Sequence, residues 1–148
     1  MKKLIRFIVV LLIAAIIIGW GFKDNIIRSY VSLCRDKLES YTTQLLEDSK
    51  LSELGEKMEF SYGAFKTYCY PKEGMVEFYT SGFGLVSSST YKGFYYSADD
   101  THKVFGAASG DDITMEIDGD RASWTDGTDN HGISVRIAEK WFWFEASF

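Results

Sequence analysis

The chain has 148 residues, with 16 Lys and Arg against 21 Asp and Glu and a formal net charge of -5. Three basic residues and no acidic ones fall in the first 22, so the rest of the chain carries a net charge of -8. This balance argues against nucleic acid as a partner, because nucleic-acid phosphates are bound by clustered cations, and 46% hydrophobic residues exclude a disordered chain.

Residues 1–22 have the pattern of a transmembrane signal anchor. Residues 7–22 are uncharged, and a helix over residues 4–22 is about 28 Å long, close to the roughly 30 Å hydrocarbon core of a bilayer. Three basic residues precede the run and the charges after it cancel, which predicts a cytoplasmic N-terminus, a single pass of the cell membrane and a C-terminal domain outside. A cleaved signal peptide is the alternative, although Gly19-Trp20-Gly21 matches the usual cleavage site poorly.

Residues 23–57 are expected to form an amphipathic stalk helix that continues the membrane helix. No Gly or Pro occurs from Asp24 to Glu53, and Gly55 is expected to end the helix. Apolar residues recur at spacings of three and four, which places one stripe on a helix: Ile27, Tyr30, Cys34, Leu38, Tyr41 and Leu45. The stripe could pair with another copy of the chain, but we expect it to pack on the protein's own sheet, which needs a cover.

Residues 58–148 are expected to form an antiparallel, aromatic-rich β domain. Of the 24 aromatic residues, 19 lie between Phe60 and Phe148, with Gly, Asp and Ser between the apolar segments. About six strands are expected, over residues 59–70, 75–80, 84–90, 93–97, 113–125 and 133–148, the last two segments as hairpins. The predicted fold class is therefore α+β, with a transmembrane helix leading into an amphipathic helix that packs on an antiparallel sheet.

The first of these hairpins is expected to turn at residues 118–119. Asp-Gly is a strong hairpin signal, and a two-residue turn there places Met115 opposite Ala122 and Glu116 opposite Arg121. Apolar pairs then lie on one face and an ion pair lies on the other.

The terminal hairpin contains the candidate binding residues. A turn at residues 139–140 pairs Val135 with Phe144 on a core face and places Arg136 across from Trp143 on the reverse face, beside Trp141. This reverse face is either covered by the stalk helix or exposed as a partner-binding surface for an envelope protein or a glycan, since Trp and Arg are enriched in binding hot spots. An odd-numbered loop would exchange the two faces.

No sequence pattern indicates a catalytic or metal site. The acidic loops around Asp126 and Asp129 could hold calcium, but they lack the EF-hand spacing and also fit ordinary turns. Neither His102 nor His131 has a neighbouring second ligand for zinc, and no nucleophile elbow or phosphate-binding loop occurs. We therefore expect no cofactor, no metal and no enzymatic activity.

The two cysteines, Cys34 and Cys69, permit a disulfide between helix and sheet. Cys34 is already explained by its place in the apolar stripe, so we expect two free thiols that pack as small apolar residues.

Two segments, residues 93–100 (GFYYSADD) and 136–148 (RIAEKWFWFEASF), resemble parts of small membrane-anchored proteins of anaerobic Gram-positive bacteria. Those proteins join an N-terminal hydrophobic segment to an aromatic C-terminal domain, and the resemblance implies no activity or site. The order of elements is also similar to that of type IV pilins, but this chain lacks the Gly-Phe cleavage junction of that family and the Glu near the start of its apolar helix.

The functional expectation is a membrane-anchored, extracytoplasmic binding module without catalytic activity, which contacts membrane lipid through its N-terminal helix. A pilin-like assembly subunit, which would self-associate, is one alternative. A small extracytoplasmic enzyme or ligand-binding domain that uses the acidic loops is the other.

Overall fold

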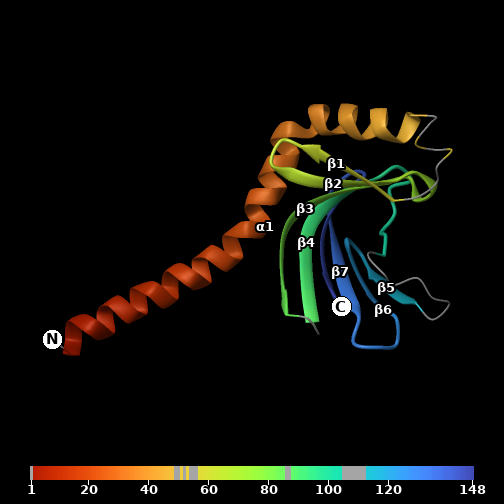
Figure 1. The fold of residues 1–148 in the computed structure, drawn as a ribbon. Helices are drawn as coiled ribbons and strands as arrows, with labels where there is room; N and C mark the ends of the chain where they lie inside the picture. The colour runs from red at the N-terminus through yellow and green to blue at the C-terminus, as the bar shows by residue number, and fades with distance from the viewer. Residues whose placement is uncertain (1, 49–50, 52, 54–56, 86–87, 105–112) are drawn as a thin grey trace.

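The computed structural model describes residues 2–48, 51, 53, 57–85, 88–104 and 113–148, with side chains except those of residues 2–24, 83–85 and 88. The fold is α+β: one N-terminal helix packs on one face of a single antiparallel sheet. Figure 1 shows that the sheet is strongly curved, that the C-terminal part of the helix lies across it and that the N-terminal part extends away from it.

Helix α1 (Lys2–Glu47) is continuous through the expected junction between anchor and stalk. It ends at Glu47 rather than near Gly55, and most of the residues in between lie outside the described part of the chain. The expected stripe packs on the sheet as predicted: Leu38 is fully buried, and its other five members pack against the same core. Val31, which the predicted stripe did not include, is also fully buried there. From Asn25 onward, where side chains are described, no helix is long and apolar enough to cross a membrane; the expected span over residues 4–22 lies outside that range.

The sheet has eight strands rather than about six, in the order β1-β2-β3-β4-β8-β7-β6-β5. The strands are β1 (Met58–Tyr62), β2 (Phe65–Tyr70), β3 (Met75–Leu85), β4 (Ser88–Ser97), β5 (Thr114–Asp118), β6 (Arg121–Thr125), β7 (His131–Ala138) and β8 (Trp141–Ser147). All neighbours are antiparallel and six of the seven pairs are consecutive in sequence. The exception pairs β4 with β8, so the chain after β4 passes to the far edge of the sheet before it returns.

The two expected hairpins contribute four of the eight strands, and two other segments differ from the prediction. Residues 59–70, expected as one strand, form the hairpin of β1 and β2, which turns at Gly63 in a left-handed conformation with φ of 57°. Residues 84–90 are not a separate strand, because β3 and β4 are both longer than expected and meet as a hairpin. Along residues 58–62, partly buried and exposed positions alternate, and this matches the alternation of apolar and polar residues in the sequence.

The hairpin of β5 and β6 turns one residue later than predicted. Gly119 has φ of 58° and occupies the first turn position, so Asp118 pairs with Arg121 and Met115 pairs with Trp124. The expected pairs Met115–Ala122 and Glu116–Arg121 are therefore wrong. The shift moves the register by two positions, so the apolar residues still share one face.

The terminal hairpin turns at residues 139–140 as predicted, but its register is wrong beyond the first pair. A β-bulge between Arg136 and Ala138 adds one residue to β7, so Arg136 lies opposite Phe142 and Val135 lies opposite Trp143. A one-residue shift moves each side chain to the other face of the sheet. Arg136 therefore lies on the opposite face from Trp143.

Apolar clusters occupy both faces of the sheet. The α1 face carries Phe78, Phe94 and Trp141, which pack beneath α1 together with Cys69 and Val76. The far face, inside the curve of the sheet, carries a second cluster: Met75, Tyr95, Trp124, Phe142, Phe144 and Ala146. Because both faces are apolar, the strands do not show the simple alternation expected of a sheet with one wet face.

Candidate functional site

Trp141, the first of the predicted binding residues, belongs to the core. Its side chain has no exposed surface and lies near the rings of Phe78 and Phe94, with centroid distances of 6.0 and 6.1 Å. Its indole N–H donates to Oε1 of Glu39 on α1, at 3.3 Å. The face of Trp141 is thus covered by the helix, and the alternative of an exposed platform is wrong for this residue.

Arg136 is tied to the turns at one end of the sheet. Its Nη1 lies 2.5 Å from Oδ1 of Asp100, its guanidinium carbon lies 4.8 Å from the ring centroid of Phe142, and its Nε lies 3.7 Å from Oδ1 of Asp120. Asp100 also accepts a hydrogen bond from the backbone N–H of Lys140. These contacts fasten the segment after β4 to the terminal hairpin, which is a structural role.

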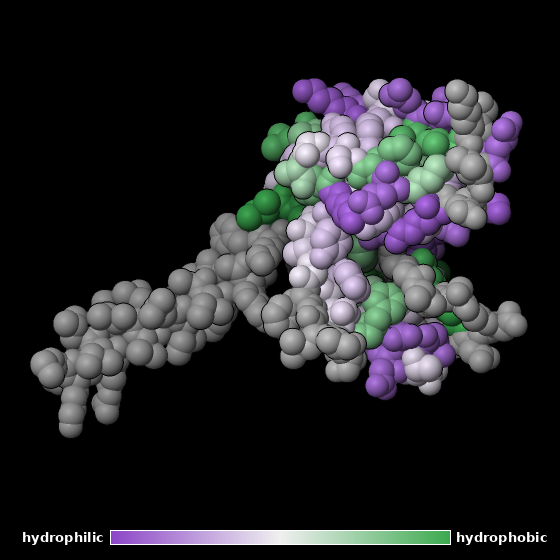
Figure 2. All heavy atoms as spheres, in the orientation of Figure 1, coloured by the Kyte–Doolittle hydropathy of each residue, from purple (hydrophilic) through white to green (hydrophobic). Residues whose placement is uncertain are grey.

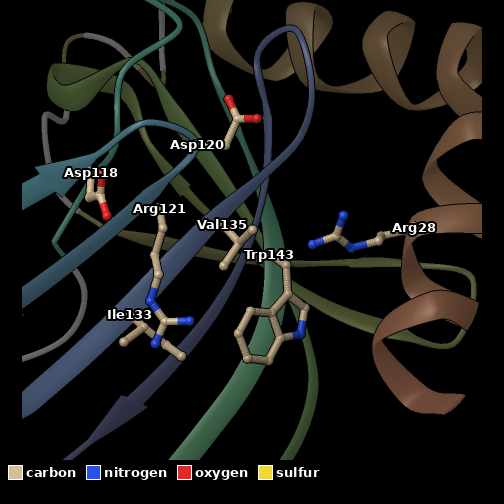
Figure 3. Close-up of a pocket in the computed structure, with 7 residues that line it drawn as sticks. All are labelled: Arg28, Asp118, Asp120, Arg121, Ile133, Val135 and Trp143. Carbon is tan, nitrogen blue, oxygen red and sulfur yellow. The ribbon is translucent and has the colours of Figure 1, made fainter. Parts of the chain in front are cut away.

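Trp143 is 7% exposed and lines an open pocket between α1 and the sheet. The pocket has a volume of about 450 Å³, and Figure 3 shows the residues around it. Ile133, Val135 and Trp143 form its apolar wall, and α1 contributes Arg28. A volume of this size is typical of sites for small ligands.

The hairpin of β5 and β6 adds charges of both signs to the pocket: Asp118, Asp120 and Arg121. Asp118 and Arg121 are cross-strand partners, yet no ion pair joins them. Figure 3 shows the guanidinium of Arg121 extended toward Ile133 and away from Asp118. Among the described residues, Arg28 and Arg121 have no carboxylate within ion-pair distance, so both can bind a ligand anion.

The indole N–H of Trp143 is buried and has no hydrogen-bond partner within the described part of the chain. A buried donor without a partner costs about 1–3 kcal/mol. The indole N–H of Trp124, which does not line this pocket, is in the same state among the described residues, so the group does not by itself mark a ligand site.

The far face holds a second polar group, formed by His102 and Ser134. Nδ1 of His102 contacts Oγ of Ser134, and the imidazole lies 4.8 Å from the ring centroid of Phe142. Burial lowers the pKa of His102, and the nearby charge of Arg136 acts in the same direction. Because Ser134 is 2% exposed, it is not presented to a substrate, and the pair instead holds the segment after β4 against the sheet.

The far face also buries a carboxyl group at Glu77, which is 7% exposed. Burial raises its pKa, although the hydroxyl of Tyr70, which donates to Oε2 at 3.0 Å, acts to lower it. Glu77 stands in the continuous strand β3 and lines neither described pocket, so we assign it no binding role.

The acidic loops have turn geometry. Asp126 accepts hydrogen bonds from the backbone and hydroxyl of Thr128 and from the side-chain amide of Asn130. Within the described ranges, no group of three or more His, Cys, Asp or Glu residues is placed to hold a metal ion, and Asp111 and Asp112 lie outside those ranges. Both cysteines are free, and burial raises the pKa of Cys69 to about 11.

Of the three predicted site residues, the structure places only Trp143 in the pocket. Arg28 could not be recognised from the sequence, because it is one of several polar residues beside the helical stripe. Arg121 was expected in an ion pair with Glu116, which the register of β5 and β6 rules out. Val135 was expected on the other face because the β-bulge has no clear signature in the sequence.

Comparison of the chain with models of protein families, with curated proteins and with solved structures gives no match, so the site is interpreted from its own geometry.

Proposed function

We propose that the chain is a membrane-anchored, extracytoplasmic binding module without catalytic activity, and that its ligand occupies the pocket between α1 and strands β6 to β8. The observation that carries this proposal is the pair Arg28 and Arg121, which line one apolar-walled pocket without an ion-pair partner among the described residues.

The anchoring part of the proposal is supported by the N-terminal sequence. The uncharged run and its basic start are typical of a signal anchor, and the continuity of α1 from Lys2 to Glu47 would fix the sheet at a constant distance from the membrane. Confinement near the membrane raises the effective concentration of the site for a partner located there.

A photo-cross-linking experiment in intact cells tests the proposal. A photoreactive amino acid replaces Ile133 in the pocket or, as the control, the exposed Lys72 outside it. We expect adducts from position 133 in the membrane fraction and none above background from position 72, and we expect external protease to degrade the sheet domain. Equal labelling from both positions, or a domain protected from external protease, would refute the proposal.

A second function, that of an assembly subunit, is favoured by one observation. Ile26 and Leu33 lie seven residues apart on α1 and are 60% and 85% exposed. Figure 2 shows apolar residues gathered where the described side chains of α1 begin. If this surface pairs two copies of the chain, Leu33→Glu should abolish dimers that chemical cross-linking detects in the wild type, whereas Lys72→Glu should not.

A further inference from the structure

We infer that the pocket binds a zwitterionic phospholipid head group, in which a phosphate and a primary ammonium are joined by a short chain. The inference rests on the proposed function, because it names the ligand of the same pocket. It follows from the signs of the charges around the pocket, from the fact that they do not neutralise one another and from the place of the pocket along α1.

The lining of the pocket carries equal numbers of positive and negative charges. Two guanidinium groups, Arg28 and Arg121, and two carboxylates, Asp118 and Asp120, surround the apolar wall. Their charges cancel, so the pocket does not favour a simple anion or a simple cation. A ligand that carries both charges complements such a lining, and one that carries a single charge meets two groups of its own sign.

The acidic and basic groups of the lining do not pair with one another. Asp118 makes no ion pair among the described residues, and Asp120 has only a long contact of 3.7 Å with Arg136, which Asp100 already binds at 2.5 Å. Figure 3 shows the two carboxylates near the turn of the β5–β6 hairpin, with the Arg121 guanidinium directed away from them and Arg28 approaching from the helix. The acidic and basic groups are thus free to bind opposite ends of one ligand.

The lining offers suitable groups for both the phosphate and the ammonium of the ligand. Guanidinium groups bind phosphate with paired N–H donors, so the anionic end can be taken by Arg28 or by Arg121, which lie on opposite sides of Trp143 (Figure 3). A primary ammonium has three N–H donors for the carboxylates of Asp118 and Asp120. Ile133 and Val135 suit the less polar part of a lipid next to its phosphate.

The pocket lies close to the expected membrane end of α1. Arg28 lies six residues beyond the expected end of the membrane helix at residue 22, which corresponds to about 9 Å along a helix. The polar layer of a bilayer extends about 5–8 Å beyond the hydrocarbon core on each side. The backbone of Arg28 is therefore expected within a few ångströms of the head groups, and its long side chain can reach them, which favours a lipid over a soluble zwitterion as the source.

Native mass spectrometry of the full chain, released from nanodiscs that contain equal amounts of three lipids, tests the inference. The lipids carry phosphoethanolamine, phosphocholine or phosphoglycerol head groups. We expect phosphoethanolamine lipid to be retained about tenfold more than the others, because the quaternary ammonium of choline cannot donate to a carboxylate and phosphoglycerol carries only the negative charge. Equal retention of all three lipids would overturn the inference.

Variants separate the contacts. Arg28→Gln and Arg121→Gln are expected to reduce retention of phosphoethanolamine lipid about tenfold, and Lys72→Gln, outside the pocket, is expected to leave it unchanged. Asp118→Asn is expected to shift retention from phosphoethanolamine toward phosphoglycerol lipid, because it removes a negative charge that repels the anion. All four positions are exposed, so a melting temperature near that of the wild type is the expected control. Wild-type retention by both arginine variants would overturn the inference.

A soluble probe distinguishes a lipid from a free zwitterion. Glycerophosphoethanolamine, which lacks acyl chains, is titrated into the full chain in detergent while the indole N–H resonance of Trp143 is followed. We expect binding at least about tenfold weaker than that of a short-chain phosphatidylethanolamine; equal affinity would identify a soluble ligand and overturn the lipid assignment. If position 133 still cross-links in cells while phosphoethanolamine lipid is not selected, the ligand class is wrong and the binding module stands.

Discussion

Substitution of Trp141 by alanine measures how much the contact between α1 and the sheet contributes to stability. Trp141 is fully buried between the helix and Phe78, Phe94 and Tyr96, whose ring centroids lie 5.3 to 6.1 Å away. Its removal leaves a cavity that rigid aromatic neighbours cannot fill. Such Trp→Ala changes cost about 3–5 kcal/mol.

The expected loss is large relative to the stability of the whole domain. Domains of this size have a free energy of unfolding of about 5–15 kcal/mol. Each kcal/mol lost from it lowers the melting temperature by about 3–5 °C. We therefore expect Trp141→Ala to lower the melting temperature by at least about 10 °C. The hydrogen bond to Glu39 adds little to this loss, because the side chain of Glu39 is 35% exposed and its carboxylate can be hydrated.

Circular dichroism of the full chain in detergent, with heating and with urea, provides the measurement. Trp141→Phe is the matched variant, since it retains most of the apolar volume and removes the N–H; it should cost about 1–2 kcal/mol. Tyr91→Ala, at a side chain that is 39% exposed, is the control and should change the melting temperature by only a few degrees. If Trp141→Ala melts like the control, α1 does not stabilise the sheet through this residue and the account of the core is wrong.

Three further substitutions test the interior and its charges. Gly93→Ala places a Cβ 2.2 Å from the backbone oxygen of Phe78, which the sheet holds in place, so urea unfolding should show a loss of at least about 2 kcal/mol. Burial raises the pKa of Glu77 above its ordinary 4.5. Glu77 therefore contributes most to the free energy of unfolding below pH 4.5, and this contribution falls as the pH rises through the raised pKa. Glu77→Gln should remove this fall in unfolding curves measured from about pH 4 to 8. Burial acts to raise the pKa of Asp100, but the Lys140 N–H and Arg136 lower it overall, below its ordinary 3.8; Asp100→Asn should therefore lower the melting temperature at pH 7, and the two proteins should converge as the pH falls below about 4.

The parts of the fold that the sequence predicts are those set by local periodicity. The stripe from Ile27 to Leu45 repeats at helical spacing, so the face of α1 that packs on the sheet could be identified without a partner in view. The turn at residues 139–140 was also predicted correctly, although no local signal fixed the length of its loop. Alternation could not assign the faces of the strands, because both faces of this sheet are apolar and each admits large aromatic residues.

The pocket could not be predicted because its residues meet only through long-range pairing. Arg28 comes from α1, Arg121 from β6 and Trp143 from β8, and each lies far from the others in the sequence. The β4–β8 pairing, which joins the two halves of the sheet, is also non-local. A sequence pattern in one element therefore shows neither which charges share a wall nor which of them remain without a partner.

The bulge in β7 decides which residues line the pocket, and this can be tested by deletion. The extra residue is Ile137, which lies between the pairs Arg136–Phe142 and Ala138–Trp141. Deletion of Ile137 would make these two pairs adjacent, with Ala138 still on the α1 face, so the register of the rest of β7 and the apolar wall of the pocket should persist.

Deletion of Ser134 has the opposite consequence, because it shifts the first half of β7 by one residue. His131 would take the place of Gly132, where an added Cβ would lie 2.4 Å from Nε1 of Trp124, a side chain that is only 3% exposed. We expect the Ile137 deletion to cost about 1–2 kcal/mol, from the loss of one partly buried side chain, and to retain the indole resonance of Trp143. The Ser134 deletion should unfold the domain. If the two deletions are equally destabilising, the bulge is not what separates the registers, and the placement of Ile133 and Val135 beside Trp143 needs another cause.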